Sequence, residues 1–163
     1  MSASRYRPHV MVLPEDDANR QLATGFRLDL SQALSRQFQV LQVAGGWRNV
    51  LEQFRSIHAR EMDACPTRFM VFLIDFDGIL TRLDEAKNVI PAHLIERVFI
   101  LGVKTRPEDF PANLGSLETI GKALARDCRE ETDTTWKHDL LRHNATELDR
   151  LRAVVRPILF NPN

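Results

Sequence analysis

Two aspartates, Asp75 and Asp77, stand one residue apart directly after the apolar run 69–74. The run FMVFLI predicts a short strand buried on both faces, of the kind found inside parallel sheets. The carboxyl edge of such a sheet is where α/β proteins usually bind ligands. Two carboxylates crowded there repel each other unless a divalent cation or a shared proton relieves the repulsion. A site for Mg²⁺ or Mn²⁺ is therefore the first hypothesis, with Asp75 and Asp77 as its leading ligands.

A second acidic cluster follows the first predicted strand. The run 9–13 (HVMVL) is succeeded by a proline and then by Glu15, Asp16 and Asp17. The strands of a parallel sheet end at one edge, so we expect Glu15 to come close to Asp75. Asp16 or Asp17 has another interpretation, because an acidic side chain also caps the start of a helix. Both interpretations stay open at this point.

The elements that position these acids follow from hydrophobic periodicity. Helices are predicted at 18–36, 47–62, 117–130 and 145–155, further short helical segments at 91–96 and 136–143, and strands at 9–13, 38–43, 69–74 and 98–103. Residues 79–89 are predicted to be an exposed loop, and 156–163 a short extra strand or a packed tail. This order predicts an α/β fold with a four-stranded parallel sheet and helices on both faces. A single domain, 1–163, is expected to carry a helical extension from about residue 115.

Composition sets limits on partners and compartment. The chain has 163 residues with 22 basic and 22 acidic side chains, so it has no net charge. A neutral chain exerts no global attraction on nucleic acid, and any such binding needs a local patch or metal ions. Two cysteines, Cys65 and Cys128, fit a reduced compartment, and no segment reaches membrane-spanning length. A cytoplasmic protein without a membrane partner is expected.

A glutamate after the first strand and an Asp-x-Asp after the third resemble the pattern of the Toprim family. The resemblance covers residues 10–110, about two-thirds of the chain. It implies a Toprim-like fold in which Glu15, Asp75 and Asp77 serve a metal-dependent nuclease. Asp16 is a further candidate ligand. Glu108, after the fourth strand, resembles the extra acid of nucleases of the overcoming-lysogenization-defect type.

One departure from that family concerns the glycine that often follows its glutamate, because Asp16 and Asp17 stand there instead. This departure suggests a divergent, stand-alone relative rather than a topoisomerase or primase module. We expect such a stand-alone unit to act within a larger complex with a protein partner.

Under the nuclease hypothesis, bound Mg²⁺ or Mn²⁺ polarises a phosphodiester and supplies hydroxide from bound water. Glu15 then acts as a metal ligand or as a general acid or base. Arg82 and Lys104 are candidates to stabilise the charge that develops on the phosphate. The alternative is that Arg82 is solvated in a polar loop and that Lys104 only neutralises the carboxylates.

Two other families share an acidic strand end. Residues 75–78 (DFDG) are similar to the nucleophile motif of haloacid-dehalogenase-like phosphatases. Residues 10–23 (VMVLPEDDANRQLA) are similar to the opening of response-regulator receiver domains, for which Lys104 would be the strand-end lysine. Two function classes remain. One is a nuclease acting on nucleic acid, and the other is a non-enzymatic signalling or scaffold domain, receiver-like or derived from Toprim, with an acidic ion-binding pocket.

Overall fold

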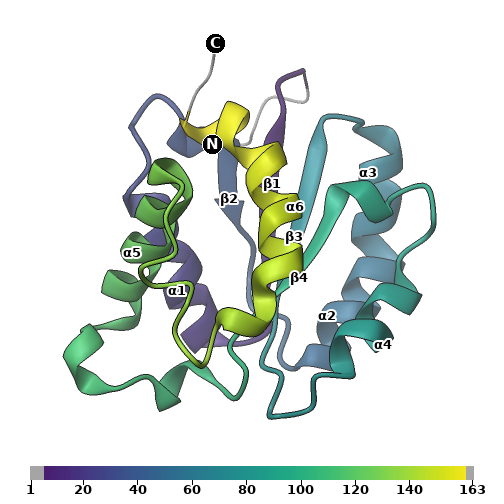
Figure 1. The fold of residues 1–163 in the computed structure, drawn as a ribbon. Coiled ribbons are helices and arrows are strands. Elements are labelled where there is room, and N and C mark those ends of the chain that lie inside the picture. Colours follow the sequence, from purple (N-terminus) through teal and green to yellow (C-terminus); the bar gives the residue numbers. More distant parts are fainter. Residues whose placement is uncertain (1–5, 161–163) are drawn as a thin grey trace.

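The sheet lies at the centre of the computed structural model, which describes residues 6–160 (Figure 1). Within that range the sheet consists of β1 (His9–Pro14), β2 (Phe38–Val40), β3 (Arg68–Leu73) and β4 (Val98–Leu101). All pairings are parallel and the strand order is β2-β1-β3-β4. The α/β class and the four-stranded parallel sheet predicted from the sequence are thus confirmed. Because the order reverses direction between β1 and β3, these two central strands flank the switch point of the sheet.

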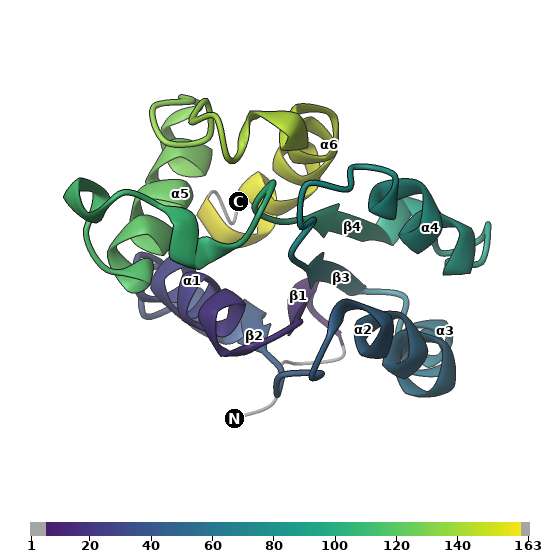
Figure 2. The same cartoon turned by 90° about the horizontal axis from the view of Figure 1, so that it is seen from below.

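Helices cover both faces of the sheet (Figure 2). The helices are α1 (Asp17–Leu28), α2 (Trp47–Gln53), α3 (Ala59–Ala64), α4 (Arg82–Val89), α5 (Leu117–Glu130) and α6 (Ala145–Val155). A π-helical turn, Phe54–His58, joins α2 to α3, and another, Arg156–Phe160, continues α6. One face carries α1, α5 and α6, and the other carries α2, α3 and α4. None of the helices between residues 6 and 160 is long and apolar enough to cross a bilayer.

Alternate strand residues enter two separate cores. Val10 and Val12 of β1 pack under α1 and α5, whereas Met11 and Leu13 pack under α2 and α3. The same alternation divides Val71 from its neighbour Phe72 in β3. Since both faces are buried, the strands appear in the sequence as continuous apolar runs.

Helices α1 and α5 approach each other closely through two glycines. A β-carbon on Gly25 would lie 2.0 Å from the carbonyl oxygen of Glu118, and one on Gly121 would lie 2.1 Å from that of Leu22. Such distances are far below van der Waals contact, so the helices can only adopt this spacing with glycine at both positions. The contact fixes α5 against α1, the helix that begins at the acidic edge.

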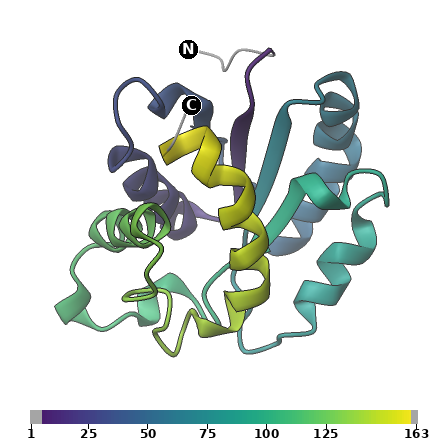
Figure 3. The ribbon, with the colours of Figure 1, turned by 45° about the horizontal axis from the view of Figure 1, so that its top comes forward.

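Helix α6 lies along the outer edge of β4 and covers it (Figures 1 and 3). The side chain of Asn144 accepts a hydrogen bond from the Gly102 N–H (3.1 Å) and donates one to the Gly102 carbonyl (2.9 Å). Glu147 accepts from the Ile100 N–H (3.2 Å), and Arg150 donates to the Ile95 carbonyl (2.6 Å). Asn144 and Glu147 thus pair with backbone groups that a fifth strand would otherwise pair with, and Arg150 binds the turn that leads into β4.

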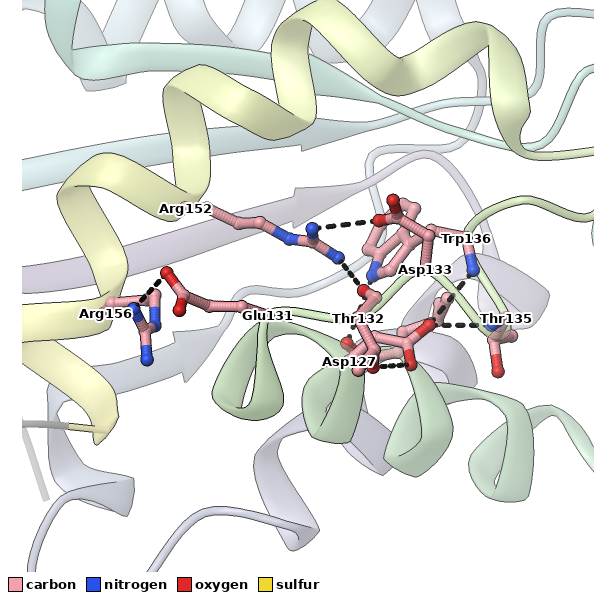
Figure 4. A network of polar contacts seen from close by, with 9 residues as sticks. Asp127, Glu131, Thr132, Asp133, Thr135, Trp136, Arg152 and Arg156 are labelled. Carbon is pink, nitrogen blue, oxygen red and sulfur yellow. Dashed lines mark hydrogen bonds and ion pairs between the residues drawn. The ribbon is translucent and has the colours of Figure 1, made fainter.

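A polar network ties the α5–α6 connection to both helices (Figure 4). The buried carboxylate of Asp127 accepts hydrogen bonds from the Thr132 hydroxyl and from the backbone N–H groups of Thr135 and Trp136. Arg152 of α6 binds the carboxylate of Asp133 at 2.9 Å and the Thr132 carbonyl at 2.5 Å. The connection is therefore held in place by side chains from each helix that it joins.

Several predicted boundaries were wrong. Residues 82–89, expected in a loop, form α4, because Leu83, Ala86 and Ile90 pack as one apolar side among charged residues. The first helix ends at Leu28 instead of residue 36. The regions 91–96 and 136–143 contain turns; the short 3₁₀ segments near them are Ile95–Arg97 and Arg142–Asn144. Of the predicted tail, 156–160 is the π-helical turn, and 161–163 lie outside the described residues.

Candidate functional site

Three carboxylates meet at the carboxyl edge of β1 and β3. In the described part of the chain, oxygens of Glu15, Asp16 and Asp75 all lie within 4.8 Å of one another, and this is the group that could hold a metal ion. Glu15 and Asp75 are 8% and 6% exposed, and Asp16 is half-buried. The meeting of the first and third strand ends that the sequence predicts is therefore present.

Hydrogen bonds fix the positions of these acids. Glu15 accepts from the backbone N–H of Asp75 at 2.6 Å, which ties the end of β1 to that of β3. Asp16 caps α1 by accepting from the Asn19 N–H at 3.0 Å. The Asn19 side-chain amide donates to Asp16 at 2.9 Å and to Asp75 at 2.8 Å. Asp16 thus fills the capping role that the sequence left open, and it also belongs to the acidic group.

Burial and mutual repulsion disfavour the charged forms of the two central acids. Burial, opposed by the hydrogen bond from Asn19 and reinforced by the charges of Glu15, Asp16 and Asp77, raises the pKa of Asp75 to about 7. Burial is also the main reason why the pKa of Glu15 is raised, although its hydrogen bond from Asp75 and the charge of Arg82 oppose the rise. Perturbed carboxylates of this kind are typical of functional sites.

Asp77 lies beside the acidic group and not within it. Its backbone adopts a left-handed conformation (φ 49°), and its exposed carboxylate pairs with Arg82 at 2.7 Å. Arg82 also donates to the backbone carbonyl of Asp75 at 2.9 Å, and its guanidinium stacks 4.7 Å from the centre of the Trp47 ring. Arg82 is therefore an ordered cation at the site, not a solvated loop residue.

The loop after β4 supplies the remaining predicted residues. The backbone carbonyl of Lys104 accepts from the Gly78 N–H at 2.8 Å, so the two loops are joined near the site. The Lys104 side chain is exposed, and its charge adds to burial, the main cause, in lowering the pKa of His143. Glu108 is exposed in the 3₁₀ turn Pro107–Asp109. Neither Asp77 nor Glu108 belongs to the group of carboxylates identified in residues 6–160.

Two residues of the site were missed from the sequence. Asn19 follows the capping Asp16 by three residues, and this spacing is a signal that a polar side chain of the first helical turn faces the strand ends. Trp47 was not among the predicted site residues, yet the guanidinium groups of Arg48 and Arg82 lie 4.8 and 4.7 Å from its ring centre. Only the fold reveals that contact, because Trp47 and Arg82 begin different helices.

Comparison with known proteins found no family model, no curated protein and no solved structure that matches the chain. The functional argument therefore depends on the geometry of the site.

Proposed function

We propose that the protein is a Toprim-like, metal-dependent phosphodiester hydrolase that acts on nucleic acid. The observation that carries the proposal is the approach of Glu15, Asp16 and Asp75 within 4.8 Å at the switch point of a parallel sheet. Oxygen donors of this kind suit Mg²⁺ or Mn²⁺. A further point in its favour is that the described part of the sheet has four strands, with its β4 edge occupied by side chains of α6.

The residues of the site divide the work in this proposal. Glu15, Asp16 and Asp75 hold the ion, which when bound polarises the phosphate and lowers the pKa of a bound water. Arg82, fixed by Asp77 and Trp47, faces the substrate and binds a phosphate oxygen. Because the chain is neutral overall, contact with nucleic acid is limited to this local cation, the ion and a protein partner in a larger complex.

The test is cleavage of DNA and RNA substrates in Mg²⁺ or Mn²⁺, with Asp75→Asn as the site variant. Asp139→Asn makes the same chemical change on an exposed side chain and serves as the matched control. We expect the activity of the site variant to fall roughly 100-fold or more, as it does when an enzyme loses a group that stabilises charge in the transition state. The control variant is expected to keep the wild-type activity. Cleavage that persists in Asp75→Asn, or no cleavage by the wild-type protein with any substrate, would refute the nuclease.

The strand order favours a second candidate, a receiver-like signalling domain. Receiver domains have the order 2-1-3-4-5, and the order β2-β1-β3-β4 matches its first four positions. In this candidate Asp75 accepts a phosphoryl group with the ion held by Glu15 and Asp16. Incubation with acetyl phosphate and Mg²⁺ would then increase the mass of the wild-type protein by about 80 Da, the mass of one phosphoryl group. Asp75→Asn would not gain this mass. An unmodified wild-type protein would remove this candidate.

A further inference from the structure

The amide of Asn19 is completely buried at the centre of the acidic group. Its exposure is 0%, and its nitrogen Nδ2 donates to one oxygen of Asp16 and to one of Asp75. Its oxygen Oδ1 is also buried and has no hydrogen-bond partner among residues 6–160. A buried amide oxygen without a partner costs stability, so its retention calls for an explanation.

The position of the amide is set by the backbone. Asn19 lies in the first turn of α1, where its own N–H is bound by the capping Asp16 at 3.0 Å. The Nδ2 atom is held by the two carboxylates, and a half-turn about the bond between Cβ and Cγ exchanges Nδ2 and Oδ1. The side chain can therefore present either a donor or an acceptor to the same point between the two carboxylates.

That point has the spacing of a metal ligand. Nδ2 lies 2.9 Å from the Asp16 oxygen and 2.8 Å from the Asp75 oxygen. Neighbouring oxygens around an octahedral ion with bonds of about 2.1 Å are separated by about 3.0 Å, which is √2 times the bond length. An oxygen at this point would complete a set of ligands with nearly the spacing that Mg²⁺ requires.

We propose that Asn19 is the fourth protein ligand of the site, its amide turned by half a rotation when the ion binds. This inference rests on the proposed function, because it assumes the metal site formed by Glu15, Asp16 and Asp75. In the empty site, the amide N–H groups hold two carboxylates together in place of the ion. With the ion bound, Oδ1 faces it and gains a partner, while Nδ2 gives up its two carboxylates to the ion and takes the buried position that Oδ1 holds here. The fourth ligand is neutral, so three carboxylates set the charge.

The first test is titration of the folded protein with Mn²⁺ by calorimetry. The variants are Asn19→Leu, which has a similar size and no oxygen, and Asn19→Asp, which keeps an oxygen at the position. Asn19→Leu is expected to weaken Mn²⁺ binding at least tenfold, and Asn19→Asp is expected to retain it. If Asn19→Leu binds Mn²⁺ as tightly as the wild-type protein or more tightly, the amide supplies no ligand and the inference fails.

A second measurement needs no variant at position 19 and so does not depend on its folding. NMR of the wild-type protein follows the side-chain amide protons of Asn19 during addition of Mg²⁺. We expect their hydrogen bonds to Asp16 and Asp75 to disappear as the site fills. Hydrogen bonds that persist at saturation overturn the ligand role while leaving the metal site intact. A wild-type protein that binds neither Mn²⁺ nor Mg²⁺ overturns this inference and the proposed function together.

Discussion

Asp75 is the residue whose surroundings most oppose its ordinary charge state. It is 6% exposed, faces the charges of Glu15, Asp16 and Asp77, and has the Asn19 amide as its side-chain hydrogen-bond donor. Its carboxylate is therefore a source of instability in the empty protein, which is typical of a group retained for function. An ion bound at the site would remove this cost by pairing with the charge.

The raised pKa gives a prediction for stability against pH. The folded protein holds a proton on Asp75 up to a pKa of about 7, above the ordinary value of 3.8. The folded state therefore binds more protons than the unfolded state between these values, and the free energy of unfolding should fall as pH rises from about 4 to about 7. Asp75→Asn should remove this fall and be about 1–3 kcal/mol more stable than wild type at pH 8.

Urea unfolding of both proteins across this pH range, followed by tryptophan fluorescence, makes the measurement. The two proteins should converge below about pH 4, where Asp75 is protonated in both the folded and the unfolded state. A variant that is less stable than wild type at pH 8 would show that the carboxylate is already compensated in the folded protein.

The residues of the site were predictable to the extent that strand topology determines them. Glu15 and Asp75 end two parallel strands, so their approach follows from the fold class alone. The place of Asp77 does not, because its left-handed backbone turns the carboxylate toward Arg82. Nothing in an Asp-x-Asp sequence specifies that turn, and the helix that carries Arg82 was itself predicted as a loop.

At the scale of elements, α6 takes the place of a strand. Asn144 and Glu147 are only 3% and 2% exposed. Their side chains bind backbone groups of Gly102 and Ile100, respectively. The Glu147 carboxylate is compensated by Arg150 at 2.5 Å and Lys87 at 3.7 Å. The helix thus satisfies the edge of the sheet through its polar residues while Leu148 and Leu151 enter the core.

Replacing Asn144 tests this arrangement. Asn144→Leu removes both partners of the buried Gly102 backbone and should lower the free energy of unfolding by about 2–4 kcal/mol. Arg142→Ala changes a neighbouring side chain that is 71% exposed and should change it by no more than about 0.5 kcal/mol. Chemical denaturation of the three proteins makes the comparison. Equal stability of Asn144→Leu and wild type would mean that water or a shifted backbone replaces the lost hydrogen bonds.

Element prediction succeeded where one apolar stripe is long. The spans 117–130 and 145–155 match α5 and α6 residue for residue. It failed for α4, which has eight residues and one fully buried side chain, Ala86. The role of Asn144 and Glu147 was also hidden, because hydrogen bonds from a helix to a sheet edge leave no periodic signal in the sequence.

The molecule as a whole has two cores, and one of them contains a cavity. An apolar cavity of about 60 Å³ lies between the sheet and the helices α1, α5 and α6, lined by residues that include Val71, Leu101, Trp136 and Leu151. Val98 belongs to the opposite core and does not line it. Empty volume reduces stability by about 24 cal/mol per Å³, so the first core has room for additional side-chain atoms.

The same substitution should therefore have opposite effects on the two faces. Val71→Ile adds a methylene toward the cavity and should stabilise the protein by about 0.5–1 kcal/mol. Val98→Ile adds it at a fully buried position that this cavity does not adjoin, and should destabilise by about 1 kcal/mol or more. Thermal unfolding of both variants and of the wild-type protein makes the comparison. A stabilising Val98→Ile or a destabilising Val71→Ile would contradict this difference between the two cores.

The covered edge of β4 has a consequence for how copies of the chain meet. An open edge strand is a template onto which another molecule can add its own strand, and repeated addition builds fibres. Here that template is occupied from within by α6, and the opposite edge is β2, with three residues. Strand addition is thereby blocked at the β4 edge of the sheet, and the short β2 edge offers few backbone groups for it. The chain can therefore reach high local concentrations without its copies joining through their strands.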